Sequence, residues 1–173
     1  MMKTYAGLTI GEEILNHPLY LLEEAVDRLK EEHAALRKGL MELREAAQTI
    51  VRERHDEQLI HIITGLKKKV VSYMSELAAH ARWEDETLFP MIAWYFGEEP
   101  EQFCAMEHGH ELAEQYVLAF LGALDRAVLP IRPEAATEMA SYLAQAYLVL
   151  MNHFQEEEEM IVTLADRSNA YGY

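Results

Sequence analysis

Proline and glycine are sparse in this chain of 173 residues, and the prolines fall mainly where long apolar segments begin. Pro18, Pro100 and Pro133 each suit the first turn of a helix, where a missing N–H costs nothing. Together with the turns between them, they predict four long helices, in the ranges 18–52, 56–96, 100–128 and 133–166. Pro90 lies within the second range, and we expect it to kink or shorten the last part of that helix.

The short connections between the four predicted helices favour antiparallel neighbours. We therefore expect an all-α fold, an up-down-up-down four-helix bundle. Half of the residues are hydrophobic, which is enough for one domain of this length to bury a full core. The expected organisation is an N-terminal extension over 1–17, the bundle over 18–166 and a C-terminal tail over 167–173.

The apolar stripes that would face the core are interrupted by residues of one chemical kind. In the first helix, apolar residues recur every three or four positions, and His33 fills the gap between Leu29 and Leu36. The stripes of the second and fourth helices are interrupted in the same way, by His80, Glu84, His153 and Glu157. A weak internal repeat adds that each half of the chain carries one lone His followed by one HxxxE pair.

These spacings predict a metal site inside the bundle. A His and a Glu four residues apart lie on the same face of a helix, so each HxxxE pair can present two ligands to one point. A buried carboxylate without a partner is costly, and a cation would offset that cost at Glu84 and Glu157. With a single cysteine in the chain, a metal must use His and carboxylate ligands, a set that suits iron, manganese or zinc.

The third helix offers two histidines, and they point about 200 degrees apart on a helix of about 3.6 residues per turn. His108 is the predicted ligand, because the sequence MEH around it resembles EEH around His33 and Leu112 continues its face. His110 is the alternative, since with Glu114 it also forms an HxxxE pair. A structural bundle or a zinc protein is a further alternative for the whole chain.

At these residues the chain resembles the hemerythrin-like family, which has a lone His on helices 1 and 3 and an HxxxE followed by an apolar-Pro segment on helix 2. The resemblance covers about 21–161. It implies two iron ions in a non-haem di-iron centre, bridged by carboxylates and a solvent oxygen as oxo or hydroxo. The positions that match the ligands of the family are His33, His80, Glu84, His108, His153 and Glu157.

The chain departs from the oxygen-carrying hemerythrins at two places. Those proteins have HxxxH on helix 3, where this chain has Leu112 four residues after His108, and HxxxxD on helix 4, where this chain has HxxxE. Four His and two Glu are instead similar to the set in the repair-of-iron-centres proteins, which are linked to nitrosative and oxidative stress. The resemblance implies that the chain binds or reacts with oxygen, peroxide or nitric oxide. Passive binding or sensing of these gases, and iron delivery without turnover, are the alternatives.

Charge and hydropathy exclude several classes of partner. A formal charge of −15 would repel nucleic acid and acidic lipid. No stretch approaches the roughly 18 uncharged apolar residues of a membrane span, and the first residues lack the pattern of a signal peptide, so we expect a cytoplasmic protein. The expected partner is a small molecule, with a homo-oligomer left open.

Overall fold

The computed structural model describes residues 18–53, 55–97 and 102–170, and in these ranges every regular element is helical. The elements are α2 (Pro18–Arg52), α3 (Asp56–Trp83), η1 (Glu84–Leu88), α4 (Phe89–Phe96), α5 (Gln102–Arg126) and α6 (Pro133–Ala170). The four predicted helices are thus confirmed, although the third ends at Arg126 instead of 128 and the fourth continues beyond 166. Pro100 and the extension over 1–17 lie outside the described residues.

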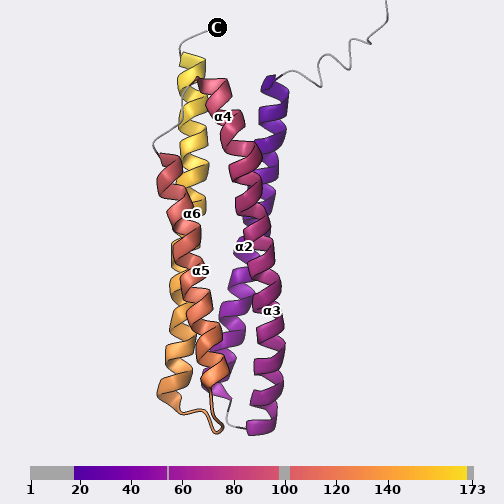
Figure 1. Cartoon of the computed structure of the whole chain (residues 1–173), viewed down its shortest axis with the longest axis vertical. Helices are drawn as coiled ribbons and strands as arrows, with labels where there is room; N and C mark the ends of the chain where they lie inside the picture. Colours follow the sequence, from indigo (N-terminus) through magenta and orange to yellow (C-terminus); the bar gives the residue numbers. More distant parts are fainter. Residues whose placement is uncertain (1–17, 54, 98–101, 171–173) are drawn as a thin grey trace, which may run out of the picture.

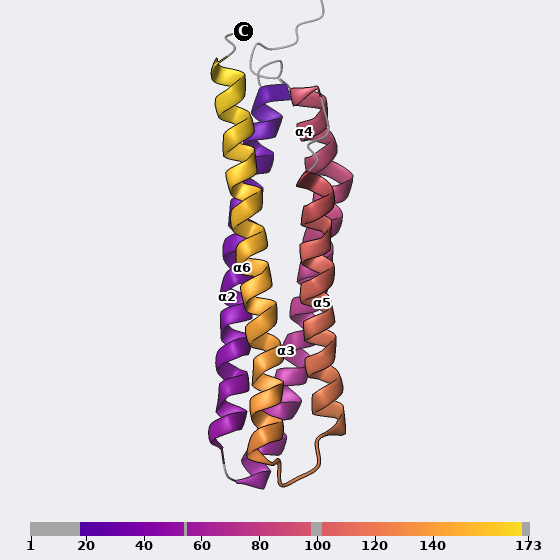
Figure 2. The same cartoon turned by 90° about the vertical axis from the view of Figure 1, so that its left-hand side faces the viewer.

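The helices α2, α5 and α6 and the continuous segment from α3 to α4 run alternately up and down beside one another (Figure 1). The helix α2 packs against α3 and α6, and α5 packs against α3 and α6, which closes the bundle. Turned by 90°, the bundle is seen to be long and narrow, with α4 at the end opposite to the α5–α6 connection (Figure 2). The predicted all-α, up-down-up-down four-helix bundle is confirmed.

The core is divided into two apolar clusters along the bundle. The larger cluster is built from residues of α2, α3, α5 and α6, such as Leu40, Val70, Phe120 and Leu143, all fully buried. The smaller cluster lies toward α4 and includes Leu29, Leu88, Ile92 and Leu164. His33 and Glu157 are buried at positions between residues of the two clusters along α2 and α6. The polar residues therefore lie where the two clusters meet.

A π-helical turn, η1, joins α3 to α4 just before Pro90. Pro90 has no N–H with which to continue the α-helical ladder, and the N–H of Phe89 bonds to the carbonyl oxygen of Glu84, five residues earlier. The second predicted helix is therefore interrupted by the turn before Pro90 and does not end there. It continues to Phe96, and Gly97 then ends it in the left-handed conformation with φ 78°.

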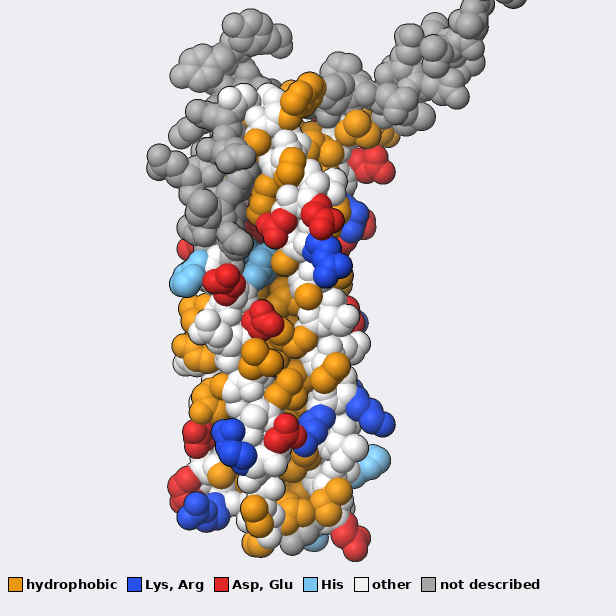
Figure 3. Space-filling model, in the orientation of Figure 1, with side chains coloured by type: hydrophobic (Ala, Val, Ile, Leu, Met, Phe, Trp, Pro, Cys, Tyr) orange, Lys and Arg blue, Asp and Glu red, His pale blue; other side chains and the backbone are white. Residues whose placement is uncertain are grey.

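On the face drawn in Figure 3, acidic and basic side chains are scattered among apolar ones. Within the described ranges, no helix combines the length and the apolar character that a membrane span requires.

Candidate metal centre

Five of the six predicted ligands meet in the interior, each from a different turn of the bundle. His33 comes from α2, His80 from the last turn of α3 and Glu84 from the first residue of η1. His153 and Glu157 lie one turn apart on α6. All five side chains are almost completely buried, and Glu84 and Glu157 are 0% exposed.

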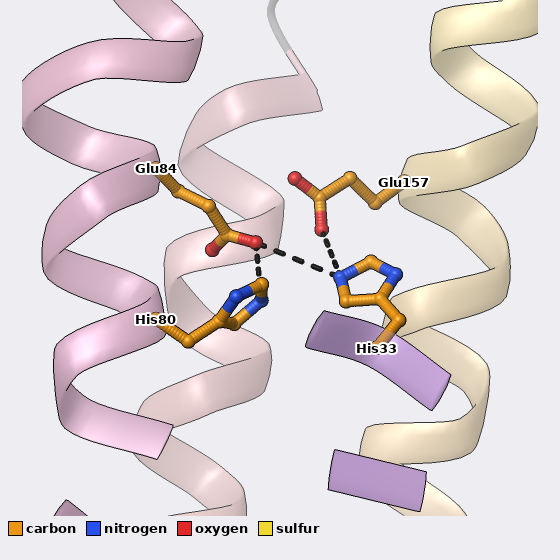
Figure 4. A group of neighbouring side chains, drawn as sticks. All are labelled: His33, His80, Glu84 and Glu157. Carbon is orange, nitrogen blue, oxygen red and sulfur yellow. Dashed lines mark ion pairs between the residues drawn. The ribbon is translucent and has the colours of Figure 1, made fainter. Parts of the chain in front are cut away.

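His33, His80, Glu84 and Glu157 form one group, in which every residue offers a ligand atom within 4.8 Å of the others. We refer to these four residues as the first group. The Nε2 atom of His80 lies 2.5 Å from Oε1 of Glu84, and the Nε2 atom of His33 lies 3.6 Å from the same oxygen. His33 is also 3.3 Å from Oε2 of Glu157 (Figure 4). Helices α2, α3 and α6 and the turn η1 therefore converge on one point.

Glu84, His110 and His153 form the second group, again within 4.8 Å of one another. Nε2 of His110 lies 3.6 Å from Oε2 of Glu84, and Nε2 of His153 lies 3.7 Å from Oε2 of Glu157. The centroids of the His110 and His153 rings are 4.1 Å apart. Glu84 is common to both groups and directs one oxygen toward each.

The close approach of α5 to α6 at this level depends on Gly109. A Cβ atom at position 109 would lie 2.9 Å from Nδ1 of His153 and 3.1 Å from Cγ of the same ring. The first of these contacts is shorter than real Cβ atoms show and the second is unusually tight, so a side chain at this position would displace the imidazole. The hydrogen of Gly109 leaves room for His153 beside His110.

Eight ligand atoms are buried here without a well-formed hydrogen bond in the part of the chain that the structure describes, and the polar atoms nearest to them are one another. They are the Nε2 atoms of His33, His80, His110 and His153 and both carboxylate oxygens of Glu84 and Glu157. Buried polar groups are satisfied almost everywhere in proteins, because an unpaired buried group costs about 1–3 kcal/mol. Imidazole nitrogen and carboxylate oxygen form a donor set for iron, manganese or zinc. These six residues, which we call the cluster, therefore fit a bound cation.

A family model, the hemerythrin HHE cation binding domain, matches residues 24–165 and so includes all six interior His and Glu residues. The chain belongs to this hemerythrin family. No curated protein and no solved structure gave a match. The family match covers most of the bundle, and it agrees with the cation-binding character of the interior His and Glu residues.

Electrostatics divide the four histidines of this hemerythrin HHE domain into two kinds. Burial lowers the pKa of His153 to about 3 and also lowers the pKa of His110, so both rings are neutral and keep a free electron pair. Burial acts in the same direction on His33, but Glu157, Glu84 and Glu158 outweigh it and raise its pKa to about 9. The pKa of His80 is likewise raised, mainly by Glu84 against the effect of burial.

The two interior carboxylates of the hemerythrin HHE domain differ as well. Burial favours the neutral form of Glu84, but the imidazoles of His33 and His80 prevail and hold its pKa below the usual range. Burial and the nearby Glu84 carboxylate raise the pKa of Glu157 to about 7, against the opposing effect of His33. Without a cation, Glu84 is therefore ionised, and its negative charge favours the protonated form of Glu157.

The structure corrects the prediction for the third helix of the hemerythrin HHE domain. His108 is on the surface, with its side chain 76% exposed and its Nδ1 atom 3.7 Å from Glu111. His110 takes the interior position, with its side chain 14% exposed. The buried stripe Ala113, Val117, Phe120 and Leu124 reaches His110 when it is extended back by three residues. A second apolar stripe through Leu112 made the wrong rotation of the helix look equally good.

Two further carboxylates of the hemerythrin HHE domain were not predicted to take part. Glu32 contacts Nδ1 of His80, and Glu158 contacts Nδ1 of His33. Both are sequence neighbours of cluster residues, and the run over 156–159 reads as a solvated acidic face. The sequence showed only that Glu32 is next to His33 and that Glu158 is next to Glu157. In the structure, each of the two carboxylates contacts a histidine on another helix.

Surface pockets reach two of the cluster histidines of the hemerythrin HHE domain. One pocket of about 370 Å³ is bounded by α3, η1 and α5, and its lining includes His110, Glu86, Glu111 and Glu114. Another of about 280 Å³ lies between α2 and α3, and its lining includes His80 and Glu32. Small molecules in solvent can thus come close to the cluster from two sides.

Proposed function

We propose that this chain holds two iron ions in the cluster and that the reduced centre reacts with oxygen, peroxide or nitric oxide. The observation that carries the proposal is the convergence of eight buried ligand atoms that lack a well-formed hydrogen bond in the described part of the chain. His33, His80, Glu84, His110, His153 and Glu157 are the proposed ligands. The bound iron would supply open coordination positions and one-electron redox chemistry.

The two groups of ligands favour two ions. The first group offers two imidazoles and carboxylates to one ion, and the second group offers two imidazoles and a carboxylate to another. Glu84 belongs to both groups, and Glu157 contacts His33 as well as His153, so both carboxylates can bridge. Six protein ligands are too many for a single open site and suit two.

The helix α5 favours a reaction with oxygen over its reversible carriage. The position four residues after His110 is Glu114, which is exposed, and Leu112 has no ligand atom. The additional histidine of the oxygen carriers is therefore missing from the helix, and coordination positions are left for small molecules. A ligand set of four His and two Glu is similar to that of the repair-of-iron-centres proteins. We therefore propose stress response or iron-centre repair as the setting in which this chain acts.

The proposal is tested by loading the metal-free protein with Fe²⁺ without oxygen and measuring its iron content and Mössbauer spectrum. We expect about two iron ions per chain. On exposure to air, the reduced protein should oxidise, and evacuation should not restore the reduced spectrum. Nitric oxide should give an iron-nitrosyl spectrum.

Each part of the proposal has its own contrary outcome. A single tightly bound zinc ion would refute the di-iron centre. Release of oxygen under vacuum over repeated cycles would support a carrier instead. If two ions bind but neither gas changes the spectrum of the reduced protein, iron delivery without turnover becomes the better function.

A further inference from the structure

Two carboxylates contact the outer nitrogens of His33 and His80. Oε1 of Glu158 lies 2.7 Å from Nδ1 of His33, and Oε2 of Glu32 lies 2.8 Å from Nδ1 of His80. A neutral imidazole carries one N–H, and a carboxylate at Nδ1 keeps that hydrogen there. When the ring is neutral, as it must be to bind a metal, Nε2 is the nitrogen left with an electron pair, and it faces the interior.

Glu32 is itself held by an arginine. Nε of Arg28 lies 2.6 Å from Oε1 of Glu32, one turn along α2, while the guanidinium lies 4.1 Å from the centre of the Trp83 ring. The other oxygen of the carboxylate is the one that contacts His80. The two oxygens thus have different partners, which fixes the orientation of Glu32 although its side chain is 29% exposed.

Glu158 also contacts an arginine, but from another helix and through the same oxygen that contacts His33. Nη2 of Arg37 lies 3.0 Å from Oε1 of Glu158, and the guanidinium lies 5.5 Å from the centre of the Phe154 ring. Phe154 in turn stacks on His33, with ring centroids 4.2 Å apart and the planes at 29°. An arginine, a carboxylate and an aromatic ring therefore surround the outer side of His33, as they do for His80.

The histidines of the second group have different surroundings. Among the described side chains, the carboxylate that contacts His110 is Glu84, and the one that contacts His153 is Glu157. Both contacts are made by Nε2, on the inner side of the ring. The outer nitrogens of His110 and His153 thus have no carboxylate partner in the described part of the chain. Among the described residues, the carboxylates that an arginine holds contact histidines of the first group.

We propose that Glu32 and Glu158 are positioning residues that make the metal position of the first group tighter than that of the second. The inference rests on the proposed metal centre. A carboxylate behind a ligating imidazole fixes the ring and increases its basicity, and loss of such a partner typically costs about 10- to 100-fold in metal affinity. Metal should therefore fill the first group before the second.

The test is an anaerobic titration of the metal-free full chain with Fe²⁺ against a competing chelator, which resolves two stepwise affinities. The variants are Glu32→Gln, Glu158→Gln and the double variant. Their matched controls are Glu31→Gln and Glu156→Gln, because these exposed neighbours undergo the same change of charge. Arg28→Gln and Arg37→Gln act one step further out and remove the group that holds each carboxylate.

For the wild type we expect two separate steps. Glu32→Gln and Glu158→Gln should each weaken the tighter step about 10- to 100-fold and leave the weaker step nearly unchanged. The arginine variants should shift the same step less, and the controls should shift neither. Thermal unfolding of the metal-free variants would show whether the fold itself has changed.

Two results would overturn the inference while leaving the metal centre intact. One is a wild type that binds two ions while the glutamate variants behave like their controls. The other is an equal weakening of both steps in the glutamate or arginine variants. If the wild type fails to bind two ions, the proposed function fails and this inference fails with it.

Discussion

Oε2 of Glu84 lies 3.6 Å from Nε2 of His110, and this contact joins the π-helical turn η1 to α5. The other oxygen of Glu84 contacts His33 and His80, on α2 and α3. One carboxylate thus connects three helices and the turn that carries it. Its residue is the only one shared by the first and second groups in the described chain.

Glu84→Ala should impair the binding of both metal ions, because it removes a ligand from each group at once. His33→Ala should mainly weaken the ion of the first group. The measurement is iron content and the Mössbauer spectrum after anaerobic loading, with Glu86→Ala, an exposed residue of the same turn, as the control. Loss of one ion only from Glu84→Ala would exclude a bridging carboxylate.

His110→Ala should remove metal from the second group, whereas His108→Ala should leave both ions bound. The reason is that only His110 reaches the interior, while His108 is 76% exposed. Because bound metal stabilises the folded state, the metal-loaded His110 variant should also have a lower Tm than the metal-loaded His108 variant. The opposite pattern of metal loss would show that the rotation of α5 described above is incorrect.

Gly109→Ala should displace His153 and weaken metal binding, because the added Cβ would lie 2.9 Å from its ring. Gly65→Ala on α3 is the matched control, since a Cβ there meets nothing within 4 Å. In that exposed helical position, alanine should stabilise the fold by about 0.5–1 kcal/mol. Iron content and thermal unfolding distinguish the two variants. Normal metal binding by Gly109→Ala would mean that α5 and α6 can separate without cost.

Metal binding should release protons, and its apparent affinity should rise with pH up to about 9. Nearby carboxylates raise the pKa of His33 from 6.5 to about 9 in the metal-free cluster, so below that pH an ion must displace a proton to reach Nε2. An unperturbed histidine would be mostly neutral above 6.5, and the additional proton release therefore falls between 6.5 and 9. Calorimetric titration in buffers of different ionisation enthalpy measures it. Proton-free binding throughout that interval would contradict the charge state assigned to His33.

The sequence alone determined the helices and most of the interior polar positions. Pro18 and Pro133 each begin a helix, and the apolar spacing in the first, second and fourth helices places His33, His80 and His153 correctly. The physical reason is local: a helix of about 3.6 residues per turn fixes which side chains share a face. Where one apolar stripe is clear, that face must be the buried one.

Only the tertiary structure decided which histidine of α5 faces the interior and which carboxylates lie behind the ligands. The segment around 112–124 is apolar on more than one face, so its sequence permits two rotations about the helix axis. Packing selected the one in which Ala113 and Val117 are buried, and His110 follows them. Glu158 contacts His33 across 125 residues of chain, a pairing that depends on how α2 lies against α6. Local periodicity sets a face for each helix, but the contacts between helices set its rotation, its height and its partners.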